Sequence, residues 1–119
     1  MAAPDGKSVW HAELRIGSSI VYMNDEMPGM GAPAPSTEHP APVGFWIWVA
    51  DCDAAFKRAT EAGATVKMAP MDMFWGDRTG TVADPFGYTW TFGTHVKDMS
   101  VEEMKRAGEE FAAKMGMKP

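Results

Sequence analysis

Apolar and polar residues alternate near the start of the chain and predict a β-hairpin. Every second residue from 10 to 16 is apolar, which is the period of a strand with one covered face. Gly17 and Ser18 form the expected turn, and residues 19–24 form the second strand. The polar positions of the first strand, which share one face, are His11, Glu13 and Arg15.

The pattern changes after this hairpin. Residues 26–42 are rich in proline and glycine, and they predict a long irregular loop. A loop of this length in a compact domain is typically a lid, a binding loop or a linker. Residues 43–49 (VGFWIWV) then predict an apolar strand that is either buried on both faces or faces a cavity on one.

Helix signals follow this strand. Asp51 and Asp53 offer N-cap oxygens, and Gly63 suits the position just after a helix end. Residues 64–68 predict a short strand, and residues 79–83 and 88–94 predict a hairpin joined by the turn DPFG at 84–87. The final helix, 100–116, starts with the capping box Ser100 and Glu103. Its apolar stripe is formed by Val101, Met104, Gly108, Phe111 and Met115.

Composition limits the class of protein. A chain of 119 residues predicts one domain, and its net charge of −5 argues against nucleic-acid binding. No apolar run is long enough to span a membrane, and the first residues do not resemble a signal peptide. The single cysteine, Cys52, fits the cytoplasm, and between Asp51 and Asp53 we expect it to be inert. Eleven methionines and five tryptophans indicate either adaptable core filling or an aromatic ligand cavity.

Several segments together resemble the glyoxalase/bleomycin-resistance/extradiol dioxygenase (vicinal oxygen chelate) superfamily, and within it the PhnB-like branch. The carrying segments are HAELRIG at 11–17, FKRATEAGA at 56–64, GDR at 76–78, DPFG at 84–87, and TH at 94–95 leading to SVEEM at 100–104. The resemblance implies an α+β fold in which paired βαβββ modules form a cup-shaped sheet, with a C-terminal helix added. It also implies a small-molecule ligand within the cup.

The first module is incomplete by this comparison. We expect a single domain 1–119, with a partial first module at 8–25, a linker loop at 26–42, a complete second module at 43–95 and a helix at 100–116. The usual first strand and helix have no counterpart, which would leave a sheet edge without a partner. We therefore expect a homodimer, with or without exchanged elements.

The resemblance also places the metal ligands of metal-dependent relatives. One ligand position falls on the absent strand, and the others fall at Tyr22, Gly44 and Thr91. These residues are poor ligands, so we expect no metal site and no cofactor there. An alternative divalent-metal site would use His11, Glu13 and His95, with His39 from the loop.

If side chains on these strands alternate between the cavity and the helices as they do in the family, one set of side chains faces a ligand. It comprises Arg15, Tyr22, Trp46, Trp48, Trp75, Arg78 and Thr91. The indoles suit a planar or cationic ligand, and the arginines suit an anionic group. Arg78 could instead pair with Asp77 or Asp84 and fix the hairpin, and Arg15 could pair with Glu13.

Two functions remain open from the sequence. The first is metal-independent binding of a small molecule in an aromatic cleft, by analogy with bleomycin resistance. The second is a lyase or isomerase acting on a small oxygenated substrate, with His11 or Glu13 as the catalytic base and a divalent metal at a non-standard site as an option. A decayed relative without a ligand is a third possibility.

Overall fold

The computed structural model describes residues 1–27, 29–31 and 33–117. The chain divides into two compact units, one of residues 1–34 and one that starts at Pro35, and each is described by itself. Within the described residues the elements are six strands and two helices, which confirms the predicted α+β class with a C-terminal helix. The domain boundaries predicted above stay a prediction.

The first unit contains the expected N-terminal hairpin. Strands β1 (Ala12–Ile16) and β2 (Ser19–Met23) pair antiparallel around Gly17, whose φ of +60° suits a tight turn. The hairpin starts later than predicted because residues 9–10 pair with the start of the chain. Val9 forms a β-bridge with Ala2, and its N–H donates to the Asp25 carboxylate.

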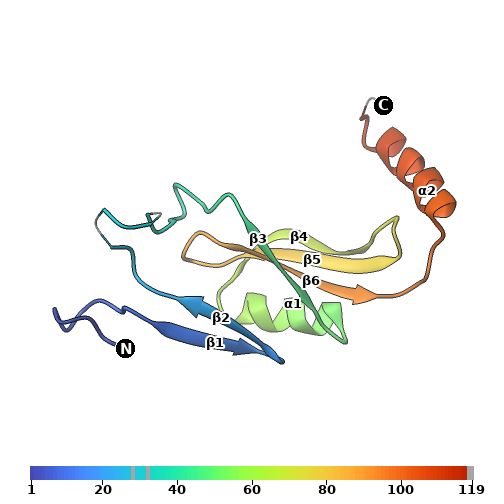
Figure 1. Cartoon of the computed structure of the whole chain (residues 1–119). Coiled ribbons are helices and arrows are strands. Elements are labelled where there is room, and N and C mark those ends of the chain that lie inside the picture. The colour runs from blue at the N-terminus through green and yellow to red at the C-terminus, as the bar shows by residue number, and fades with distance from the viewer. Residues whose placement is uncertain (28, 32, 118–119) are drawn as a thin grey trace. The chain divides into compact units, whose positions relative to one another are not determined.

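The second unit is built on a four-stranded mixed sheet (Figure 1). Its spatial order is β3 (Gly44–Trp48), β6 (Thr89–His95), β5 (Asp77–Ala83) and β4 (Thr65–Asp72). Strand β3 runs parallel to β6, and the other neighbours are antiparallel. Helix α1 (Cys52–Glu61) connects β3 to β4 and covers one face, so this unit has the predicted βαβββ order.

Aromatic and small side chains pack between α1 and the sheet. Phe45 stacks on Trp90 with ring centroids 4.5 Å apart, and Gly80 leaves room for the ring of Phe56. The Cys52 thiol, which is buried, donates to the Phe92 carbonyl. Burial raises the pKa of this thiol, and the neighbouring Asp53 raises it further, so the thiolate is disfavoured.

Strand β4 extends further than the predicted residues 64–68, because two irregularities accommodate its proline. The pairing with β5 shifts between Val66 and Met68 and again between Met68 and Met71. Pro70 lies in the second shift, where its missing N–H removes no regular ladder bond. Its ring packs toward Gly80 on the α1 side, so the proline contributes to the core instead of ending the strand.

Helix α2 (Val101–Lys114) begins as the capping box predicts. The Ser100 hydroxyl accepts a hydrogen bond from the Glu103 N–H. On the predicted stripe, Phe111 lies 5.4 Å from Phe74 between ring centroids, and Gly108 also faces Phe74. The stripe is therefore covered in its middle, while its ends are exposed. Within residues 1–27, 29–31 and 33–117, no helix is long and apolar enough to cross a membrane.

Candidate functional site

The sheet face opposite α1 carries Trp46, Trp48 and Thr91, three of the seven residues that the sequence assigned to a ligand site. Strand register determines this placement, because partners on neighbouring strands point to the same face. One row across β3, β6 and β5 consists of Trp46, Thr91 and Thr81. The next row consists of Trp48, Gly93 and Thr79. We call these six residues the open face, although Thr79 and Gly93 are buried and its accessible part consists of the two tryptophans with Thr81 and Thr91.

Two tryptophans dominate the open face. Their ring centroids are 5.5 Å apart at an interplanar angle of 60°, and Trp46 and Trp48 are 44% and 62% exposed. The Trp46 indole lies directly over Gly93, where a Cβ atom would approach the indole Nε1 to 2.7 Å. Beside it, the hydroxyls of Thr81 and Thr91 form a hydrogen bond of 2.8 Å. The face thus combines aromatic rings with neutral hydroxyls.

A Gly93→Ala substitution is expected to displace the Trp46 indole and lower the free energy of unfolding by about 1–2 kcal/mol. The added methyl cannot fit unless the ring moves, because all three nearest atoms belong to that indole. The indole N–H signal of Trp46 in NMR spectra and urea unfolding measure the two effects. An unchanged Trp46 signal would contradict the arrangement. Gly44→Ala, where a Cβ would lie 3.1 Å from the Thr89 hydroxyl, serves as a control on the same face.

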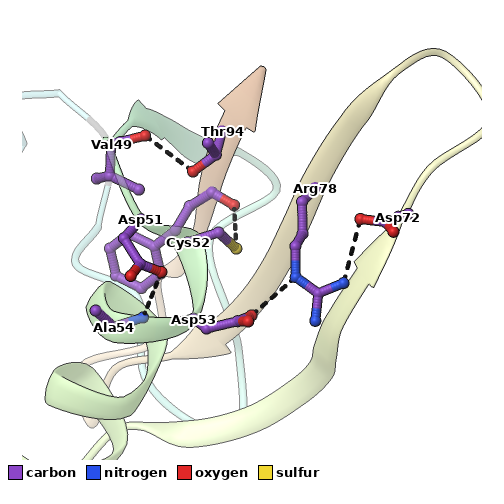
Figure 2. A network of polar contacts seen from close by, with 9 residues as sticks. Val49, Asp51, Cys52, Asp53, Ala54, Asp72, Arg78 and Thr94 are labelled. Atoms are coloured by element: carbon purple, nitrogen blue, oxygen red, sulfur yellow. Dashed lines mark hydrogen bonds and ion pairs between the residues drawn. The ribbon is translucent and has the colours of Figure 1, made fainter. Parts of the chain in front are cut away.

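Arg78 does not join the tryptophans. Its guanidinium lies on the α1 side, where Nε is 3.0 Å from Asp53 Oδ1 and Nη1 is 3.2 Å from Asp72 Oδ1 (Figure 2). The hydrogen bond to Asp53 contributes most to a raised pKa of Arg78, and the hydrogen bond to Asp72 raises it further. Arg78 therefore links α1, β5 and β4, although its partners differ from the two aspartates considered from the sequence.

Trp75 belongs to a polar cluster that sequence reasoning missed. Its indole Nε1 donates to Asp77 Oδ2 at 2.7 Å, and His95 Nδ1 lies 2.9 Å from Asp77 Oδ1. His95 Nε2 lies 2.6 Å from Asp98 Oδ1. Asp77 is only 7% exposed, whereas the His95 side chain is 55% exposed. The hydrogen bond to Asp77 contributes most to a raised pKa of His95, and the hydrogen bond to Asp98 raises it further.

The register of the β5–β6 hairpin is the signal that would have found this cluster. A hairpin that pairs Thr81 with Thr91 also pairs Asp77 with His95. Both residues then point to the same face as Thr79 and Gly93, because side chains on a strand alternate. The cluster therefore adjoins the open face at the end where β6 leaves the sheet.

The first unit holds the other predicted site residues. His11 Nε2 lies 3.9 Å from Glu13 Oε2, and the His11 ring meets Tyr22 edge-on at 4.7 Å. Arg15 pairs across the hairpin with Ile20. His39 belongs to the second unit, in the loop before β3, where its carbonyl accepts from the Ser36 N–H. In the part of the chain that the structure describes, no three His, Cys, Asp or Glu side chains converge on a point suited to a metal ion.

Curated relatives match most of the chain. A protein of Mycobacterium tuberculosis strain H37Rv is 44% identical over 107 residues, which cover 87% of this chain and 62% of that protein. A protein of Mycobacterium bovis is also 44% identical to this chain over 107 residues, and the match covers 70% of that protein. The chain thus spans between three fifths and seven tenths of these relatives.

Solved structures have the same fold. TioX from Micromonospora sp. ML1 is 33% identical, with a TM-score of 0.57 over 72% of this chain and 68% of TioX. The protein PA1353 from Pseudomonas aeruginosa, at 24% identity and a TM-score of 0.57, covers 80% of this chain and is itself covered to 69%. The model of the Glyoxalase/Bleomycin resistance protein/Dioxygenase superfamily matches residues 3–92. A match over well over half of the sequence, on a βαβββ sheet with one open aromatic face, makes this chain a member of that superfamily.

Proposed function

We propose that this protein binds a small planar molecule on the open face, stacked against Trp46 and Trp48, without using a metal ion. The observation that carries the proposal is the pair of exposed indoles, 5.5 Å apart, on the face that α1 leaves uncovered. Exposed large aromatic rings gathered on one surface are typical of a binding site. The neighbouring threonine hydroxyls can orient a ligand without adding charge.

The chemistry of the metal-ligand positions supports metal independence. Gly44 has no side-chain donor, and the Thr91 hydroxyl is already hydrogen-bonded to Thr81. A neutral hydroxyl is a poor ligand for the divalent ions that bind through histidine and carboxylate. The residues at these positions therefore do not fit a metal of the family type.

We further propose that the protein is a homodimer of the PhnB-like branch. Apolar side chains beside the open face are partly exposed in the single chain, among them Met68 and Met71 on β4, which pair with Thr81 and Thr79. A second copy would cover such surface and supply an opposite wall for the ligand. Light scattering during gel filtration at micromolar concentration tests this, and a monomer would contradict it.

Loss of one indole is expected to weaken ligand binding about tenfold, or about 1.4 kcal/mol. The first compounds to titrate by calorimetry are bleomycin and the naphthalene dye 8-anilinonaphthalene-1-sulfonate. Trp48→Ala should weaken binding of whichever compound binds. Phe86→Ala removes an exposed aromatic ring from the β5–β6 turn and is the matched control. Equal affinities in the two variants would place the ligand elsewhere.

A second candidate function rests on the first unit. The proximity of His11, Glu13 and Tyr22 favours a proton-transfer site of a lyase or isomerase acting on a small oxygenated substrate. His11→Ala should then abolish turnover, while leaving binding at Trp48 intact. Turnover that survives in both His11→Ala and Glu13→Ala would remove this candidate, and activity lost on chelation would indicate a metal at a non-standard site.

A further inference from the structure

In the polar cluster of Trp75, Asp77, His95 and Asp98, the two nitrogens of the His95 ring have different partners. One partner is fixed and the other is exchangeable. Asp77 is buried and also accepts the Trp75 indole N–H, so it holds the Nδ1 side of the ring in place. Asp98, in the segment between β6 and α2, is fully exposed, and its carboxylate contacts His95 Nε2. An exposed ion pair contributes little stability because both charges can be hydrated instead. The Asp98 carboxylate can therefore be replaced at Nε2 by another anion.

His95 lies within reach of a ligand stacked on Trp48. Trp48 is the partner of Gly93 on β6, and His95 is two residues further along β6 on the same face. One strand spacing and two residues of rise separate the Cα atoms of Trp48 and His95 by about 8 Å. A fused two-ring aromatic with one substituent spans a distance of this size.

His95 is also the cation that strands β3, β5 and β6 offer on this face. Strands β3, β5 and β6 are described in full, and their basic residues are Arg78 and His95. Arg78 lies on the α1 side, held by Asp53 and Asp72. An anionic group on a ligand at the open face therefore has His95 as its partner on these three strands.

We propose that His95 Nε2 is the anion-binding end of the open face, and that the ligand is a planar aromatic carboxylate, or a similar aromatic anion, whose charged group replaces Asp98. This inference rests on the proposed binding function and specifies its ligand class. The imidazolium donates a charge-assisted hydrogen bond from Nε2 to the ligand, while Asp77 keeps the ring oriented. Asp98 occupies the same place in the free protein.

The preference for an anion should depend on pH. The charged groups facing the ring are Asp77 from β5 and Asp98 from the segment before α2, and both favour the imidazolium. The pKa of His95 is raised above its usual value of about 6.5. The preference for an anionic ligand is therefore fully present below about pH 6.5, where the ring is protonated. It is lost as the pH rises through the raised pKa.

The test uses two probes of equal shape, 2-naphthoate and 2-naphthamide, and the full chain. Binding is followed by NMR through the indole N–H signals of Trp46 and Trp48, at about pH 6 and about pH 8. The wild type should prefer naphthoate at the lower pH. His95→Gln should remove this preference while naphthamide binding is unchanged. Asp98→Ala should raise naphthoate affinity several-fold, because the competing carboxylate is gone, and should not affect naphthamide.

The outcomes separate this inference from the proposed function. One outcome is that both probes shift the Trp46 and Trp48 signals while His95→Gln keeps the naphthoate preference. In that case the proposed anion site at His95 is wrong, and the proposed ligand binding on the open face is retained. If neither probe shifts these signals at millimolar concentration, both proposals fail. Should His95→Gln fold poorly because Asp77 loses a partner, Asp98→Ala decides alone, and an unchanged naphthoate affinity overturns the inference.

Discussion

Replacing Gly76 with alanine is expected to lower the free energy of unfolding by about 3 kcal/mol or more. Two independent costs add at this position. Gly76 has a φ of +98°, a conformation that alanine rarely adopts. A Cβ atom there would also lie 2.1 Å from the Lys97 carbonyl oxygen, which is backbone and cannot swing away. Urea unfolding followed by tryptophan fluorescence measures the loss.

Gly63→Ala is the matched control for this prediction. Gly63 has a φ of +114°, yet nothing lies within 4 Å of a Cβ built on it. Its substitution therefore adds only the backbone strain, about 1–2 kcal/mol. Equal losses in the two variants would show that the close approach of the Lys97 carbonyl does not exist.

The close approach at Gly76 matters for the candidate site. The Gly76 carbonyl accepts hydrogen bonds from the N–H groups of Val96 and Lys97. These bonds hold the backbone between His95 and Asp98, so that Asp98 is placed at the Nε2 side of the imidazole. A Gly76→Ala variant that folds should therefore also lose the His95–Asp98 contact, which makes the turn a determinant of the proposed anion site.

Local signals in the sequence were sufficient for most elements. Asp51 and Ser100 cap the two helices as their positions predict, since a cap depends only on residues two or three positions away. In β3, Trp46 and Trp48 lie on the face opposite Phe45, because neighbouring side chains on a strand point to opposite faces. Such features need no knowledge of distant parts of the chain.

Contacts between distant residues were harder to predict. Arg78 is bound by Asp53, 25 positions away on α1, whereas sequence reasoning considered only the nearby Asp77 and Asp84. Likewise, the pairing of Asp77 with His95 follows from the β5–β6 register, which is visible only when both strand ends are known. Strand β4 is longer than the predicted residues 64–68, because irregular pairing with β5 accommodates Pro70, which a regular inner strand would exclude.

An Asp84→Ala substitution is the second change expected to have a large effect, with a loss of about 2–4 kcal/mol of unfolding free energy. Asp84 Oδ1 accepts hydrogen bonds from the N–H groups of Phe86 and Tyr88, and Oδ2 accepts from the Trp90 indole at 2.9 Å. Trp90 in turn stacks on Phe45 beneath α1. One carboxylate thus links the β5–β6 turn to the core, and alanine would leave partly buried donors without acceptors.

Asp84→Asn separates the two roles of this carboxylate. An asparagine can keep the acceptor for Phe86 and Tyr88 but presents an NH₂ group to the Trp90 indole N–H. We expect about half the loss caused by alanine, together with a shift of the Trp90 indole signal. Binding at Trp48 should be retained in folded Asp84→Asn, because Trp90 lies on the α1 side of the sheet and Trp48 on the other. Loss of binding in that variant would mean that the ligand reaches the α1 face, and the open face would no longer be the site.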